Sequence, residues 1–171
     1  VAKEQVESLG AKFIEVKDEE SGEDGSGYAK EMSDDYKRKQ SELIAETIKK
    51  QDIVISTALI PGRPAPTLIT EEMVQTMEQG SVIVDLAAAN GGNCPLTELD
   101  DVTVKHGVAL IGYSNMTSRV AIDASQLYAR NIYNFVSTLL IEENAINVKW
   151  DDELVKGTLL TKDGEMLHPI F

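Results

Sequence analysis

Three segments of the sequence combine residue types that bind small polar ligands with a position directly after a strand-like run. Residues 56–61, 85–93 and 113–119 are rich in small residues, amides and hydroxyls. Small side chains let a backbone approach a ligand closely, while amides and hydroxyls can hydrogen-bond sugars and carboxamides. Ligands of open parallel sheets bind beyond the carboxyl ends of the strands. The three segments therefore predict a binding edge, although the same composition also suits ordinary loops.

Strands and helices that alternate along the chain must position these segments. Runs of β-branched and other apolar residues predict strands at 12–16, 52–57, 81–86 and 108–113. Apolar spacing and capping residues predict helices at 2–9, 34–50, 70–77 and 119–140. This alternation implies a parallel sheet that is covered by helices on both faces.

The end of the chain has a different pattern. Short strands are predicted at 146–150, 154–161 and 165–167, with a hairpin turn at 162–164. We therefore expect an α/β fold: the second half of a doubly wound, Rossmann-like parallel sheet, a long linking helix and a small β-rich tail. Residues 1–140 are expected to form the partial sheet domain. Residues 141–171 are expected to belong to, or pack on, another subdomain.

Composition excludes several classes of function. The net charge of −13 opposes binding to nucleic acid, which needs a surplus of Lys and Arg to neutralise phosphates. Cys94 is the single cysteine, so neither an intrachain disulfide nor a cysteine-based zinc site can form. The apolar-rich stretch 119–141 carries Asp123 and Arg130, which indicates a packed helix and not a membrane span.

Four stretches together resemble one known family. They are GYAKEM at 27–32, TALIPGRPAP at 57–66, VDLAA at 84–88 and GGN at 91–93. Their order and spacing resemble the NAD(H)-binding domain of the alpha subunit of proton-translocating NAD(P) transhydrogenase, over nearly the whole chain and least in the tail. The resemblance implies that NAD(H) binds here and exchanges hydride with NADP(H) on a partner component. It also implies a membrane-embedded component that couples this transfer to proton translocation.

The resemblance implies a set of cofactor-binding residues and no catalytic side chain or metal. They are Gly27, Tyr28, Ala29 and Met32 on a loop that folds over the nucleotide, Thr57, Ala58 and Leu59 at a strand end, and Asn90 and Gly91 near the nicotinamide. The residues themselves allow simpler interpretations: Tyr28 as a solvated loop tyrosine, Leu59 as a core leucine, and Gly91-Gly92 as a tight turn. The protein would position the cofactors and exclude water, while the cofactors supply the chemistry.

The family's glycine-rich phosphate cradle and its ribose-binding acidic residue would lie before Val1. The glycines at 22, 25 and 27 follow no strand and so do not fit a dinucleotide fingerprint. We therefore expect that this chain without further segments is inactive and binds NADH weakly. The resemblance also implies a homodimer that is peripheral to the cytoplasmic side of a bacterial inner membrane, or to the matrix side in mitochondria.

Two alternatives remain at this point. The sister family, alanine dehydrogenase, shares the surroundings of Asp85 and of Arg119, but it carries an aspartate at the position of Ala89. An amino-acid dehydrogenase must move a proton as well as a hydride, whereas transfer between two nicotinamides needs no acid–base group there. Ala89 therefore favours transhydrogenase. The second alternative is a non-catalytic fragment that serves in dimerisation and docking.

Overall fold

The computed structural model of the chain describes residues 2–16, 33–60 and 62–168. The chain divides into two compact units, Val1–Asn115 and Met116–Phe171. The assignment of residues 1–140 to a nucleotide-binding domain, and of 141–171 to another subdomain, stays a prediction.

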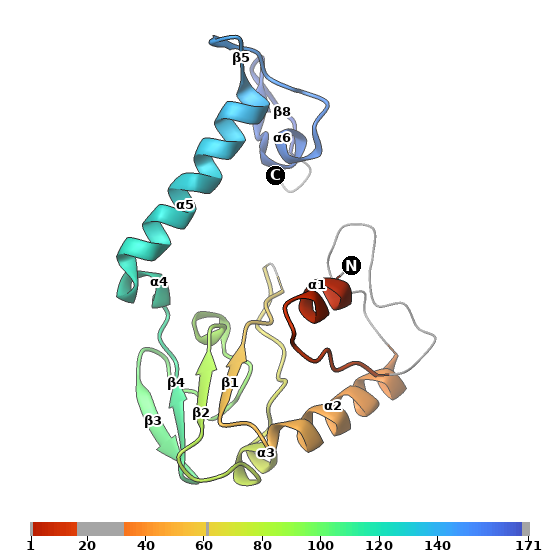
Figure 1. Cartoon of the computed structure of the whole chain (residues 1–171), viewed down its shortest axis with the longest axis vertical. Coiled ribbons are helices and arrows are strands. Elements are labelled where there is room, and N and C mark those ends of the chain that lie inside the picture. The colour runs from red at the N-terminus through yellow and green to blue at the C-terminus, as the bar shows by residue number, and fades with distance from the viewer. Residues whose placement is uncertain (1, 17–32, 61, 169–171) are drawn as a thin grey trace. The chain divides into compact units, whose positions relative to one another are not determined.

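A four-stranded sheet forms the first unit, in the order β1-β2-β4-β3 (Figure 1). The strands β1 (Ile53–Ser56), β2 (Val82–Asp85) and β4 (Val108–Ile111) run parallel, as the sequence predicts. The strand β3 (Val102–Lys105), which the sequence does not predict, pairs antiparallel with β4. A tight turn joins β3 to β4, and both its residues, His106 and Gly107, have positive φ. The α/β class and the parallel strands are thus confirmed.

One face of this sheet carries the hydrophobic core. The buried core residues come from the sheet, from the helix α2 (Asp34–Ile48), from the helix α3 (Glu71–Gln75) with its flanks, and from the loop after β2. They are Ile48, Ile69, Met73, Val74, Met77, Ile83, Cys94, Val108 and Leu110. Both predicted helices are confirmed, with Ser33 and Thr70 as caps whose side chains accept hydrogen bonds from Tyr36 N and Met73 N.

The other face of the sheet is apolar but not covered within the described part of the first unit. Its side chains, given by the strand register, are Ile53, Ile55, Val82, Val84, Val102, Val104, Ala109 and Ile111. Ile55 is 62% exposed and Val104 is 67% exposed. Within the described residues of this unit, helices cover one face of the sheet, and the expectation of helices on both faces stays a prediction.

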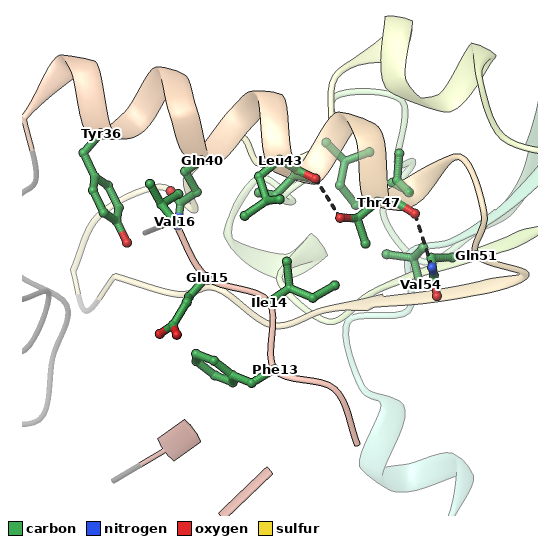
Figure 2. Close-up of a pocket in the computed structure, with 13 residues that line it drawn as sticks. Phe13, Ile14, Glu15, Val16, Tyr36, Gln40, Leu43, Thr47, Gln51 and Val54 are labelled. Carbon is green, nitrogen blue, oxygen red and sulfur yellow. Dashed lines mark hydrogen bonds between the residues drawn. The ribbon is translucent and has the colours of Figure 1, made fainter. Parts of the chain in front are cut away.

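The strand predicted at 12–16 is also wrong. The helix α1 (Ala2–Ser8) ends before Gly10, which has a φ of 78°, as expected. The residues after it form no strand, because a strand requires backbone partners and none in the described sheet pairs with them. Residues 13–16 instead lie beside α2 (Figure 2).

The second unit contains a long helix and two hairpins. The predicted helix at 119–140 appears as α4 (Met116–Arg119), α5 (Ala121–Phe135) and the π-helical turn η2 (Val136–Leu140). The first hairpin pairs β5 (Ile141–Glu142) with β6 (Ala145–Ile146), and the second pairs β7 (Thr161–Lys162) with β8 (Glu165–Met166). The predicted turn at 162–164 is confirmed, with positive φ at Asp163 and Gly164.

The strand predicted at 154–161 is wrong, because residues there form the helix α6 (Glu153–Thr158). The Asp152 carboxylate caps this helix by accepting a 2.8 Å hydrogen bond from Leu154 N. Of the strand predicted at 146–150, only Ile146 belongs to a strand. None of the helices in the described ranges has the length and apolar character needed to cross a membrane.

Candidate functional site

The loops that follow β1 and β2 meet at the carboxyl edge of the sheet, where the sequence predicts ligand binding. The Asn93 side chain accepts a hydrogen bond from Ala58 N at 3.0 Å and donates to the Ala58 carbonyl at 2.9 Å and to the Pro66 carbonyl at 2.8 Å. The Asn90 carbonyl accepts a hydrogen bond from Ala65 N at 2.8 Å. The structure therefore brings the segments that contain Ala58 and Asn90 together, although 35 positions separate Ala58 from Asn93.

A buried carboxylate fixes the loop after β2. Asp85 is fully buried and accepts hydrogen bonds from Ala87 N, Asn93 N, Cys94 N and Thr97 Oγ1, at 2.8 to 3.1 Å. Buried carboxylates require such donors to offset the loss of water. The arrangement makes Asp85 a structural acceptor of backbone hydrogen bonds.

The glycine pair shapes this loop. Gly91 follows the short helix η1 (Ala88–Asn90) in the left-handed conformation, with a φ of 98°. A Cβ built on Gly92 would lie 2.8 Å from Asp85 Oδ2, so the backbone at Gly92 packs directly on the carboxylate. A Cβ on Gly91 would meet no atom within 4 Å. The turn interpretation of the pair is correct, and the Gly91 backbone is also open to a ligand.

The predicted site residues that the structure describes lie on the exposed side of these loops. Thr57, Asn90 and Gly91 are exposed, Leu59 is 51% exposed, and Ala58 is half-buried. The interpretation of Leu59 as a core residue is therefore wrong. Gly27, Tyr28, Ala29 and Met32 lie outside the described residues. An exposed set of small, hydroxyl and amide groups above a buried polar anchor suits a ligand that binds through sugar and amide groups.

The third segment is anchored separately. Asp100, whose φ is 60°, accepts hydrogen bonds from Ser114 N and Ser114 Oγ at 2.8 and 2.6 Å. The backbone of Gly112 bonds in both directions with the loop 98–101, through Asp100 N and the Asp101 carbonyl. This anchor fixes the chain directly after β4.

Cys94 offers no reactive thiol. It is fully buried, and burial raises the pKa of its thiol, which disfavours the nucleophilic thiolate. Within residues 2–16, 33–60 and 62–168, no group of three or more His, Cys, Asp or Glu side chains could hold a metal ion.

A cavity of about 430 Å³ lies away from this edge, between residues 13–16, α2 and β1 (Figure 2). Phe13, Leu43 and Val54 contribute to its mainly apolar wall. The nearby polar groups of Thr47 bond locally, with the Leu43 carbonyl and with Gln51 Nε2. No described residue of the predicted site lines this cavity, so we place the candidate site at the strand-end loops.

The role of Asn93 is the main feature that sequence reasoning does not find. Asn93 is fully buried, and its partners Ala58 and Pro66 are distant in sequence. The GGN stretch indicates a turn, and the residue type allows hydrogen bonding. Neither signal identifies which loop the amide binds.

Comparison with known proteins identifies the family. The family described as "Alanine dehydrogenase/PNT, C-terminal domain" matches residues 1–169. An NAD(P) transhydrogenase alpha-subunit protein of Rhodospirillum rubrum is 52% identical over 170 residues, which is 98% of this chain and 44% of the relative. The "NAD(P) transhydrogenase subunit alpha" of Haemophilus influenzae is 48% identical over 98% of this chain and 33% of the relative.

A solved structure and a more distant relative agree with this result. The crystal structure of transhydrogenase from Sinorhizobium meliloti has a TM-score of 0.68 and 48% identity, covering 96% of this chain and 42% of that chain. The alanine dehydrogenase of Lysinibacillus sphaericus is 43% identical over only 53% of this chain and 28% of the relative. The chain spans less than half the length of these transhydrogenase relatives. The chain belongs to the alanine dehydrogenase/PNT C-terminal domain family.

Proposed function

We propose that this chain is part of the NAD(H)-binding component of a proton-translocating transhydrogenase. The proposal rests on the strand-end edge where Ala58 bonds to Asn93 and Ala65 bonds to Asn90, which joins the loops after β1 and β2. The transhydrogenase relatives align over 98% of this chain. Thr57, Leu59 and Gly91 present exposed groups along that edge. We assign to them, and to Gly27, Tyr28, Ala29 and Met32 by resemblance, the binding of NAD(H).

The reaction places few demands on the side chains. The bound nicotinamide supplies the hydride, which would pass to the oxidised nicotinamide of NADP+ on a partner component without release of a proton at the reacting carbons. The residues at the edge would then act by holding the dinucleotide in register and excluding water. Ala89, exposed beside Asn90, offers no acid–base group. That absence suits direct hydride transfer better than the amino-acid oxidation of the alternative, alanine dehydrogenase.

The experiment is a pair of assays on the complete enzyme that carries this chain. NADH should reduce an NADP+ analogue whose reduced form absorbs at its own wavelength, and L-alanine with NAD+ should give no NADH. The opposite pattern would establish the alanine dehydrogenase alternative. Inactivity in both assays, with NADH binding also absent, would favour a non-catalytic docking role.

We also propose the partners that the transhydrogenase relatives suggest. They are an NADP(H)-binding component and a membrane-embedded component, with this chain peripheral to the cytoplasmic side of a bacterial inner membrane or to the mitochondrial matrix side. The names of the relatives, as alpha subunits, support an assembly of several components.

A second copy of the chain is a further proposed partner, in a homodimer. No described residue of the first unit covers the apolar face that includes Ile55 and Val104, and no described strand pairs with the outer edge of β1. Both features favour association in water. Sedimentation of the 171-residue chain at low micromolar concentration should show a dimer. A monomer over that concentration range would contradict this part of the proposal.

A further inference from the structure

The Asn93 side chain connects two loops that are distant in sequence. It bonds twice to Ala58 and once to Pro66, which lie 35 and 27 positions away. Its own backbone is fixed as well, because Asn93 N donates to Asp85 Oδ2 and the Asn93 carbonyl accepts from Leu68 N and Ile69 N. The buried residue thus links the loop after β1 to the carboxylate at the end of β2.

The chemistry of this contact requires an amide. One oxygen accepts from Ala58 N, while the NH2 group donates its two hydrogens to two different carbonyls, those of Ala58 and Pro66. An aspartate in the same shape would direct an oxygen at both carbonyls, and an apolar side chain would leave three partly buried polar groups without this partner. Two of these bonds hold the Ala58 backbone, and the third holds the same loop at Pro66.

The position of Ala58 matters because its sequence neighbours form one exposed side of the candidate site. Thr57 and Leu59 flank Ala58 in sequence and are exposed. The other side of the candidate site is formed by Asn90 and Gly91, which precede Asn93 by a few residues. Backbone bonds at Ala65, Leu68 and Ile69 hold the far part of the loop without the Asn93 side chain. Loss of the Asn93 side chain should therefore free the backbone near Ala58 to move more than the rest of the loop.

We propose that Asn93 is a positioning residue for the nucleotide site. Its amide sets the distance between residues 57–59 on one side of the site and residues 90–91 on the other. This inference rests on the proposed function. Hydride transfer is sensitive to small displacements of the cofactor. A positioning residue should therefore affect NADH affinity and transfer, whereas a residue that only supports the fold should affect melting alone.

The test compares Asn93→Ala with Thr97→Val in the complete transhydrogenase that carries this chain. Thr97→Val removes a hydrogen bond to the same Asp85 carboxylate but leaves all three Asn93 bonds to the loop 58–66 in place. Both variants should lower the melting temperature. Asn93→Ala should raise the NADH dissociation constant and KM by about tenfold and slow hydride transfer, whereas Thr97→Val should change each by less than about twofold.

Equal NADH constants for Asn93→Ala and the wild type would overturn the inference, as would Thr97→Val changing them as much as Asn93→Ala does. If Asn93→Ala does not fold, Asn93→Ser replaces it, because its hydroxyl keeps one donor and one acceptor and should give a smaller effect of the same kind. The wild-type protein separates the two hypotheses. A wild type that does not bind NADH contradicts the proposed function, whereas a wild type that binds normally beside an unaffected Asn93→Ala contradicts only the positioning role.

Discussion

Gly112→Ala should destabilise the first unit by roughly 3 kcal/mol or more, at the upper end of the usual cost of overpacking. A Cβ on Gly112 would lie 2.2 Å from the Glu98 carbonyl oxygen and 2.7 Å from Thr97 Cγ2. The first of these contacts is with backbone, which cannot rotate away. Gly112 cannot retreat either, because its N–H and its carbonyl both bond to the loop 98–101.

Thermal melting followed by circular dichroism measures this effect, with Gly157→Ala as the matched control. Gly157 lies in α6, where a Cβ would meet no atom within 4 Å. Alanine is favoured over glycine in a helix interior by about 1 kcal/mol, so the control should melt at the same temperature as the wild type or higher. A Gly112→Ala protein that melts with the control would show that the close approach at Glu98 is not present in solution.

Asp85→Ala should be the most damaging substitution of a polar residue in the strand-end loops, lowering the free energy of unfolding by about 3 kcal/mol or more. Four hydrogen bonds converge on this fully buried carboxylate, three of them from backbone N–H groups. Removing the acceptor would leave those donors buried without it. Asp85→Asn should be less severe, because its oxygen can still accept while its NH2 group must face a donor.

Urea unfolding of each variant gives the free energies, and Asp101→Asn controls for the change in charge. The Asp101 carboxylate is exposed and accepts a local hydrogen bond from Val102 N, which an amide oxygen can also accept. Its substitution should cost no more than about 0.5 kcal/mol. Comparable losses for Asp85→Ala and Asp101→Asn would mean that the Asp85 network contributes little to the fold.

The elements with long, regular patterns are those that the sequence predicts well. The periodicity of α2 and the β-branched runs of β1 and β2 reflect local chemistry, so these elements appear where expected. The strand β3 is harder to predict, because its turn to β4 depends on a left-handed conformation at His106, which is uncommon for residues other than glycine.

The two wrong strand predictions have different physical causes. Residues 12–16 have strand-like composition, but pairing depends on a neighbouring strand and not on composition. Residues 154–161 contain an apolar run that suits either a strand or a short helix, and the Asp152 cap stabilises the helix.

Part of the candidate site follows from the sequence and part does not. The rule that ligands bind at the carboxyl ends of parallel strands locates the segments of Thr57 and Asn90 at one edge. The contact between them runs through Asn93, which reaches a partner 35 positions away. Periodicity and local motifs carry no information on such a contact, because it exists only once the sheet has formed.

We propose that NAD(H) binds at the edge where the β1 and β2 loops meet. Hydrogen–deuterium exchange on the complete NAD(H)-binding component, with and without saturating NADH, tests this location. Peptides that cover residues 57–60 and 89–92 should exchange more slowly with NADH. Peptides that cover the β3–β4 turn at residues 105–108, beside the amino end of β4, should not change. Unchanged exchange at 57–60 and 89–92 in the NADH-saturated protein, or protection confined to the β3–β4 turn, would contradict it.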